Sequence, residues 1–236
     1  MEPTEKPLYP KRRRIYLMRH GDVSYFDASG RPFRPDTVPL NDEGRLQAES
    51  AGRVLAGIPI DRVVASDLIR SVHTATLAVA GKGLQVETYE QLREIQPGRL
   101  ADIPPEEMET AFIGAFVADV TRESRFLAGE TFGSLIDRVQ ICFQNLLGDK
   151  GWKHLLIVAH GGVNRIILTH ALGVGLQGFG TFEQDPGCLN ILDVDDAGRM
   201  LIRLVNYTPD NPVKKGMELT TMERLYFQYR SKRELP

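Results

Sequence analysis

Residues 14–21 read Arg14-Ile15-Tyr16-Leu17-Met18-Arg19-His20-Gly21, and this stretch decides the fold. Its four consecutive apolar residues are too few for a helix and are typical of a short buried strand. A second apolar run, at 155–159, is followed by His160 and two glycines, so both strands end in a histidine and a glycine. Because the carboxyl ends of parallel strands meet at one crevice, we expect His20 and His160 to face a common ligand.

Strand and helix patterns alternate along the rest of the chain. The additional strands are predicted at 62–65 and 84–88, and the helices at about 42–56, 67–80, 131–147 and 162–172. Segments 189–194 and 200–205 flank a turn and indicate a hairpin. The sequence therefore predicts an α/β fold: a three-layer α/β/α sandwich, with a mostly parallel sheet, an antiparallel edge strand and an inserted lid.

Four regions are expected along the chain: a flexible lead-in at 1–13, a catalytic domain at 14–206, a lid within it at about 97–130, and a C-terminal extension at 207–236. The extension carries a short helix, since Thr220 and Glu223 have the spacing of a capping box. Its apolar stripe can dock on the same chain or join two copies as a homodimer, and both interpretations stay open.

Polar residues mark the starts of two more helices. Asn41 or Asp42 is expected to cap the first helix, and Ser66 or Asp67 the second.

Composition excludes several classes of partner. The 236 residues carry a net charge of −2, so nothing global attracts nucleic acid or an acidic membrane surface. The apolar run that begins at Ile15 is far too short for a signal or membrane segment. Only two cysteines occur, too few for a disulfide framework, and we expect a cytoplasmic protein.

The residues at the strand ends suit phosphate binding. Arg19 lies beside His20, and Arg70 follows the second strand; both guanidinium groups can fork onto phosphate oxygens. Gly21 and Gly161 let the backbone approach an anion closely.

The same residues offer the groups that phosphoryl transfer requires. A neutral imidazole is a nucleophile near pH 7, and His20 is expected to attack phosphorus. His160 can donate to the same phosphoryl group and stabilise its charge. Glu94, expected at the end of the third strand, is the candidate acid for the leaving alkoxide.

Six ordered motifs between residues 15 and 205 resemble the histidine phosphatase superfamily, branch 1, which includes the cofactor-dependent phosphoglycerate mutases. The matching segments are Leu17 to Gly21, Leu40 to Ala48, Ser66 to Ala75, Leu92 to Gly98, Gly129 to Val139, and Val158 to Arg165. The resemblance implies a phosphohistidine on His20, a phosphate pocket of Arg19, Arg70 and His160, and an acid at Glu94. It implies no metal and no cofactor.

The sequence departs from the family beside the nucleophile. Many members carry Ser or Thr three residues after it and Asn six after it, where this chain has Val23 and Phe26. Ser24 can substitute as a substrate-binding residue, or the proline-rich loop at 30–39 can reshape the pocket around a bulkier substrate. Both alternatives stay open.

A phosphatase acting on a small phosphorylated metabolite is the favoured function. The alternative is a phosphoglycerate mutase-type transfer, but sugar-acid mutases typically carry Glu-Arg-His-Tyr-Gly after the acid, where this chain has Ile95 to Leu100. A phosphoprotein phosphatase needs an open pocket, and the predicted lid argues against one. An inactive scaffold is also disfavoured, because the polar residues that the reaction requires are all present. Sugar phosphates, phosphoglycerates, cobalamin-pathway nucleotide-loop phosphates and phosphoserine all remain candidate substrates.

Overall fold

Strand β1 (Arg12–Arg19) lies inside a six-stranded sheet with the order β3-β2-β4-β1-β5-β6. The computed structural model describes residues 11–27, 30–117 and 120–231. Strands β2 (Arg62–Ser66), β3 (Val86–Tyr89) and β4 (His154–Ala159) run parallel to β1. Strand β5 (Leu189–Asp195) pairs antiparallel with β1, and β6 (Met200–Tyr207) completes the hairpin at the edge of the sheet. The predicted α/β fold class is confirmed.

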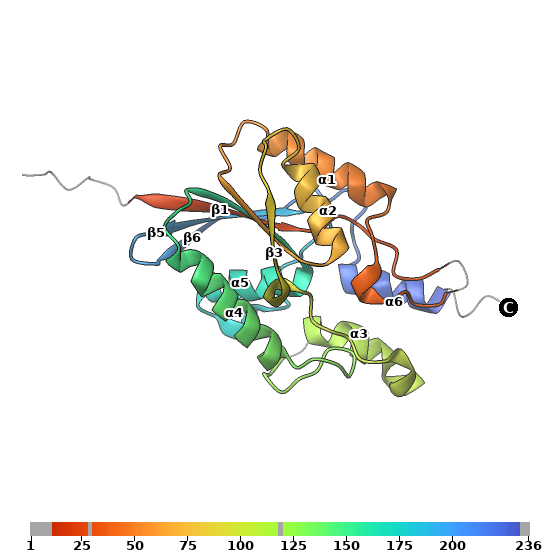
Figure 1. Ribbon diagram of the computed structural model, residues 1–236. Coiled ribbons are helices and arrows are strands. Elements are labelled where there is room, and N and C mark those ends of the chain that lie inside the picture. The colour runs from red at the N-terminus through yellow and green to blue at the C-terminus, as the bar shows by residue number, and fades with distance from the viewer. Residues whose placement is uncertain (1–10, 28–29, 118–119, 232–236) are drawn as a thin grey trace, which may run out of the picture.

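Helices cover both faces of this sheet because its central strands are buried on both sides (Figure 1). Ile15 and Leu17 join the core beneath α4 (Phe132–Gly148) and α5 (Gly161–Leu172). Tyr16 and Met18 point the other way, into the core beneath α1 (Asp42–Leu55) and α2 (Ile69–Ala78). This period-two alternation in β1 produces the three layers.

One of the two predicted helix caps is correct. The Asn41 side chain accepts a hydrogen bond from the Gly44 amide at 2.8 Å and caps α1. The prediction that Ser66 or Asp67 caps α2 is wrong, since the helix begins after Leu68 without a side-chain cap. Ser66 belongs to β2, and the Asp67 carboxylate is held instead by two hydrogen bonds from Arg93.

The region expected as a lid contains little regular structure before α3 (Met108–Val117). Short 3-10 turns precede it at Leu100–Asp102 and Pro105–Glu107, and others lie at Pro35–Thr37, Glu90–Leu92 and Gly175–Gly178. Residues 118–119 of this region lie outside the described part of the chain.

The C-terminal helix α6 (Thr221–Ser231) begins at the predicted capping box. The Glu223 amide donates to Thr220 Oγ1, and the Thr220 amide donates to the Glu223 carboxylate. The apolar stripe packs on α3, where the ring of Phe112 lies 5.8 Å from that of Tyr226 and 5.5 Å from that of Tyr229. The stripe therefore docks on its own chain, and α6 closes one side of the region beyond the strand ends (Figure 1).

The lead-in expected at 1–13 lies largely outside the described residues, and β1 already includes Arg12 and Arg13. Within the described ranges, no helix has the length and apolar character that crossing a membrane requires.

Candidate active site

The two strand-end histidines lie against each other. His20 follows β1 and His160 follows β4, and the register pairs Arg19 with Ala159 just before them. Their ring centroids are 5.0 Å apart in an edge-on arrangement, and both side chains are buried. Parallel pairing thus brings together residues that are 140 positions apart in the sequence.

The tautomer of His20 is set by its own backbone. Nδ1 lies 2.7 Å from the Gly21 carbonyl oxygen, which can only accept, so Nδ1 carries the proton and Nε2 the lone pair. Burial, followed by the nearby charges of Arg70 and Arg19, lowers the pKa of His20 well below its ordinary value. His20 is therefore a neutral imidazole whose Nε2 carries the electron pair that nucleophilic attack requires.

Arg70 reaches this electron pair from the first turn of α2. Its Nε donates to His20 Nε2 at 3.3 Å, and its Nη1 donates to the Pro35 carbonyl at 2.5 Å. Arg70 is 2% exposed, so the proline-rich loop and α2 together fix a guanidinium beside the nucleophilic atom.

Arg19 approaches from the end of β1. Its Nη1 donates to the Gln184 carbonyl at 2.5 Å and to Thr221 Oγ1 at 3.2 Å. Its buried Nε has no hydrogen-bond acceptor within the described residues. A methyl group added to Gly161 would lie 3.6 Å from this Nε, so the free edge of Arg19 faces the start of α5. A guanidinium with a buried free donor beside a helix N-terminus is suited to bind an anion.

His160 lies behind His20 and does not line the cavity in front of it. Its Nε2 is 3.3 Å from Ser71 Oγ, and its Nδ1 has no partner in the described chain. Burial and then the charge of Arg70 lower the pKa of His160 well below its ordinary value. A bound phosphate would oppose this shift, because an adjacent anion favours the protonated ring.

Glu94 also lines the cavity. Its Oε1 accepts from its neighbour's amide, Ile95 N–H, at 2.9 Å, and its Oε2 accepts from Gly162 N–H at 3.1 Å. The expectation that Glu94 ends the third strand is wrong: β3 stops at Tyr89, and a 3-10 turn carries the chain onward. The carboxylate is positioned by α5 rather than by strand pairing.

Arg138 on α4 holds the segment that carries Glu94. Its guanidinium donates to the carbonyls of Arg93 at 2.6 Å and Glu94 at 3.1 Å, and it is paired with Glu130 at 2.9 Å. Glu130 in turn accepts from the Gln96 amide at 3.0 Å. Sequence reasoning included Arg138 and Glu130 in a matching motif but assigned them no task.

The structure does not bring Ser24 to this site. Its side chain is exposed, and the neighbouring residues Val23 and Tyr25 line the cavity instead.

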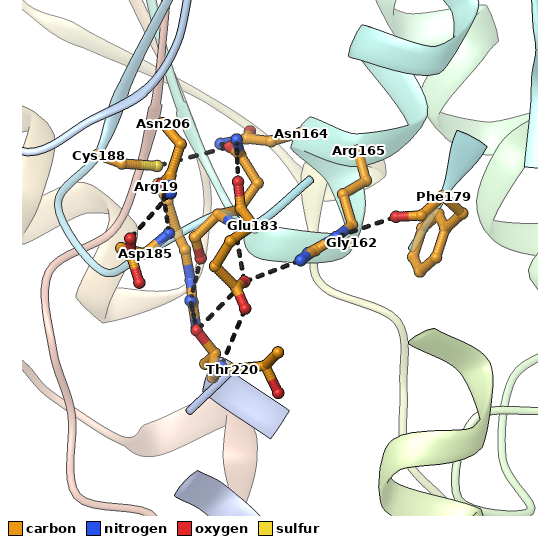
Figure 2. A network of polar contacts seen from close by, with 12 residues as sticks. Arg19, Gly162, Asn164, Arg165, Phe179, Glu183, Asp185, Cys188, Asn206 and Thr220 are labelled. Carbon is orange, nitrogen blue, oxygen red and sulfur yellow. Dashed lines mark hydrogen bonds and ion pairs between the residues drawn. The ribbon is translucent and has the colours of Figure 1, made fainter. Parts of the chain in front are cut away.

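Glu183 links the site to α6. It pairs with Arg165 of α5 at 2.8 Å and accepts from the Thr221 amide at 3.1 Å, while Thr221 Oγ1 accepts from Arg19 (Figure 2). Sequence reasoning missed Glu183, Gln184 and Thr221. The capping box was the only local signal near them.

The cavity in front of these groups encloses about 1090 Å³. His20, Arg19, Arg70 and Glu94 lie along its wall, so the nucleophile, the cations and the candidate acid share one space. In the described ranges, no three side chains of the types His, Cys, Asp and Glu are grouped to hold a metal ion.

Comparisons with known proteins find similar sequences and similar structures. A sequence model of the histidine phosphatase superfamily (branch 1) matches residues 15–207. The adenosylcobalamin/alpha-ribazole phosphatase of Escherichia coli K12 is 26% identical over 187 residues, covering 77% of this chain and 90% of that protein. The 2-carboxy-D-arabinitol-1-phosphatase of Triticum aestivum is 28% identical over 89% of this chain, but the match spans only 44% of that longer protein.

Solved structures show the same fold. The alpha-ribazole phosphatase from Shigella flexneri has a TM-score of 0.68 and 25% identity, over 82% of this chain and 96% of that one. A mycobacterial glucosyl-3-phosphoglycerate phosphatase in complex with inorganic phosphate has a TM-score of 0.68 and 22% identity, over 84% of this chain and 98% of that one.

Proposed function

This chain belongs to the histidine phosphatase superfamily (branch 1), and from that premise we propose that it hydrolyses a small phosphomonoester through a phosphohistidine formed on His20. It is a phosphomonoesterase of this superfamily. The observation that carries the proposal is the state of His20: its Nδ1 proton is held by a carbonyl, and its Nε2 lone pair lies next to Arg70.

In the first step, His20 Nε2 attacks phosphorus and the bond to the ester oxygen breaks. Arg19 and Arg70 offer guanidinium donors to the oxygens of the transferring group, whose charge they neutralise in a water-poor pocket. His160, packed against His20, gains a proton more easily once the phosphate dianion is bound in front of His20.

Glu94 completes the proton balance. Its carboxylic acid gives a proton to the departing alkoxide, and the resulting carboxylate then takes a proton from water. That water attacks the phosphohistidine, the P–N bond breaks, inorganic phosphate forms, and His20 is restored as a neutral imidazole. The Gly162 amide holds the carboxyl group in place for both transfers, and Arg138 holds the backbone carbonyl of Glu94.

The relatives support a metabolite as substrate, since those named above act on small phosphorylated compounds according to their names. We also propose a cytoplasmic location, because both cysteines are buried free thiols. Burial raises the pKa of Cys188 to about 12, which keeps that thiol unreactive.

The test is phosphate release from p-nitrophenyl phosphate by the wild-type protein and by His20→Ala, with and without EDTA. The wild type should release phosphate in both buffers, and the variant should release none above the buffer rate. Unchanged activity in His20→Ala would remove the nucleophile from the proposal. Faster interconversion of 3- and 2-phosphoglycerate than phosphate release would instead assign the chain to the mutase alternative.

A further inference from the structure

We infer that the preferred substrates are phosphomonoesters whose alcohol portion is a bulky aromatic group; this deepens the proposed function and rests on it. The inference comes from the composition of the cavity wall beyond the phosphate-binding residues.

Phenylalanine is concentrated around this one cavity. The chain has ten phenylalanines, and eight of them line it: Phe26, Phe33, Phe112, Phe116, Phe126, Phe132, Phe179 and Phe182. The lining comprises 50 of the 236 residues, so an even distribution would place about two there. Five of these side chains are almost fully buried and also pack the interior: Phe26, Phe112, Phe126, Phe132 and Phe179. The same phenylalanine rings therefore both pack the protein interior and line the cavity.

The first aromatic wall replaces polar residues beside the nucleophile. Phe26 occupies a position where many relatives have a polar residue, and a backbone bridge pairs it with Pro32. Phe33 follows in the same loop and is 47% exposed while lining the cavity. Ser24 lies outside the cavity and so is no replacement phosphate contact, whereas Phe26 and Phe33 add apolar surface beside the exposed guanidinium of Arg34, which also lines the cavity.

The second wall lies where the lid meets α5. The Phe116 and Phe179 rings are 5.4 Å apart, and the Arg165 guanidinium lies 5.0 Å from the Phe116 ring centroid. Phe182 continues this surface. Phe179 is only 1% exposed, so a ligand meets this wall through the half-buried rings of Phe116 and Phe182, on which an aromatic group gains energy beyond the area it buries.

The third wall comes from α6, which follows the family-matched residues 15–207. Met222 and Leu225 line the cavity from the face of α6 that packs on the core. The C-terminal extension thus adds apolar surface from outside the segment that the family model matches.

Three arginines that line the cavity are already paired with carboxylates. Arg93 is paired with Asp67, Arg165 with Glu183, and Arg224 with Asp185. A sugar or glycerol portion would bury hydroxyl groups against phenylalanine, and an unpaired buried hydroxyl costs affinity. A cavity of about 1090 Å³ is also much larger than a three-carbon ester fills.

The experiment compares kcat/KM for 2-(2-naphthyl)ethyl phosphate, ethyl phosphate and glycerol 3-phosphate, all of which release an alkoxide. Burying a naphthyl group should raise kcat/KM by about 100-fold over ethyl phosphate. Equal values for the naphthyl and ethyl esters, or a preference for glycerol 3-phosphate, would overturn the inference while leaving the phosphatase intact. Failure to hydrolyse any ester, including p-nitrophenyl phosphate, would overturn both proposals.

Two exposed phenylalanines give a matched pair of variants that should fold normally. Phe33 lines the cavity and is 47% exposed, whereas Phe227 on α6 is 52% exposed and does not line it. Phe33→Ala should lower the naphthyl-to-ethyl ratio of kcat/KM by about fivefold, as expected for part of one aromatic contact. Phe227→Ala should leave the ratio unchanged. Equal effects of the two substitutions would contradict the assignment of this wall to substrate binding.

Discussion

Gly162→Ala offers a selective way to displace the candidate acid. An added methyl group would lie 2.5 Å from Glu94 Oε1, so the carboxylate must retreat by about 1 Å to reach an ordinary contact distance. Misplacement of a catalytic group by about 1 Å can cost about 100-fold in rate. We therefore expect kcat for an alkyl phosphate to fall by about 100-fold. The fold should survive, because alanine is a better helix former than glycine at this position in α5.

The assay compares an alkyl phosphate with p-nitrophenyl phosphate, whose stable leaving anion needs no proton. In a rapid-mixing experiment the burst of p-nitrophenol, which reports the first transfer alone, should slow by no more than about threefold, since proton donation to the leaving group is the only role of Glu94 in that step. Gly161→Ala is the matched control: its methyl group would meet Arg19 atoms at 3.6 and 3.7 Å, which are ordinary contacts. Any loss there should be equal for both esters. If Gly162→Ala slowed the first transfer from both esters equally, or from neither, Glu94 would not be the proton donor.

Three other variants test the surroundings of the site. Thr221→Val removes a hydrogen bond to Arg19 and should lower kcat/KM about tenfold, whereas Thr221→Ser should restore it; equal activity of both would exclude a positioning role. In Arg138→Lys, the lysine cannot donate to both backbone carbonyls of the Glu94 segment. The free energy of unfolding, measured by urea denaturation, should fall by about 2 kcal/mol. The loss of kcat should be larger for alkyl esters than for p-nitrophenyl esters. Burial lowers the pKa of His160 in the folded chain, so the unfolded chain binds more protons below about pH 6.5. The free energy of unfolding should therefore decrease as pH falls, by at most about 1.4 kcal/mol per pH unit for this residue. His160→Asn should flatten that dependence, and an identical slope in wild type and variant would show that His160 is not its source.

Much of the fold could be predicted because its signals are local. The apolar runs that form β1 and β4 are bounded by polar residues, and the prediction matches both strands to within two residues. Asn41 could be found as a cap because its side chain bonds the backbone three residues on. The α2 start was missed because Asp67 bonds Arg93, which is 26 positions away and leaves no local pattern.

The same difference between local and long-range signals applies to the residues of the site. The residues that would carry the reaction follow strands or motifs, and the structure brings His20, Arg70 and Glu94 to one cavity. Their supports do not follow local patterns. Arg70 is held by the backbone carbonyl of Pro35, and a backbone contact of this kind leaves no side-chain pattern in the sequence. Arg19 is held by Thr221, which is 202 positions away. Such contacts depend on how loops and α6 fold over the sheet, which short-range periodicity does not describe.

The most direct measurement is NMR of the phosphoenzyme trapped by rapid base quench during turnover. Phosphohistidine survives base, and the coupling of phosphorus to the ring identifies the modified nitrogen. The geometry predicts phosphorus on Nε2 of His20, because the Gly21 carbonyl occupies Nδ1–H. Label on Nδ1, on another residue, or on no residue at all while turnover continues would contradict nucleophilic attack by His20 Nε2.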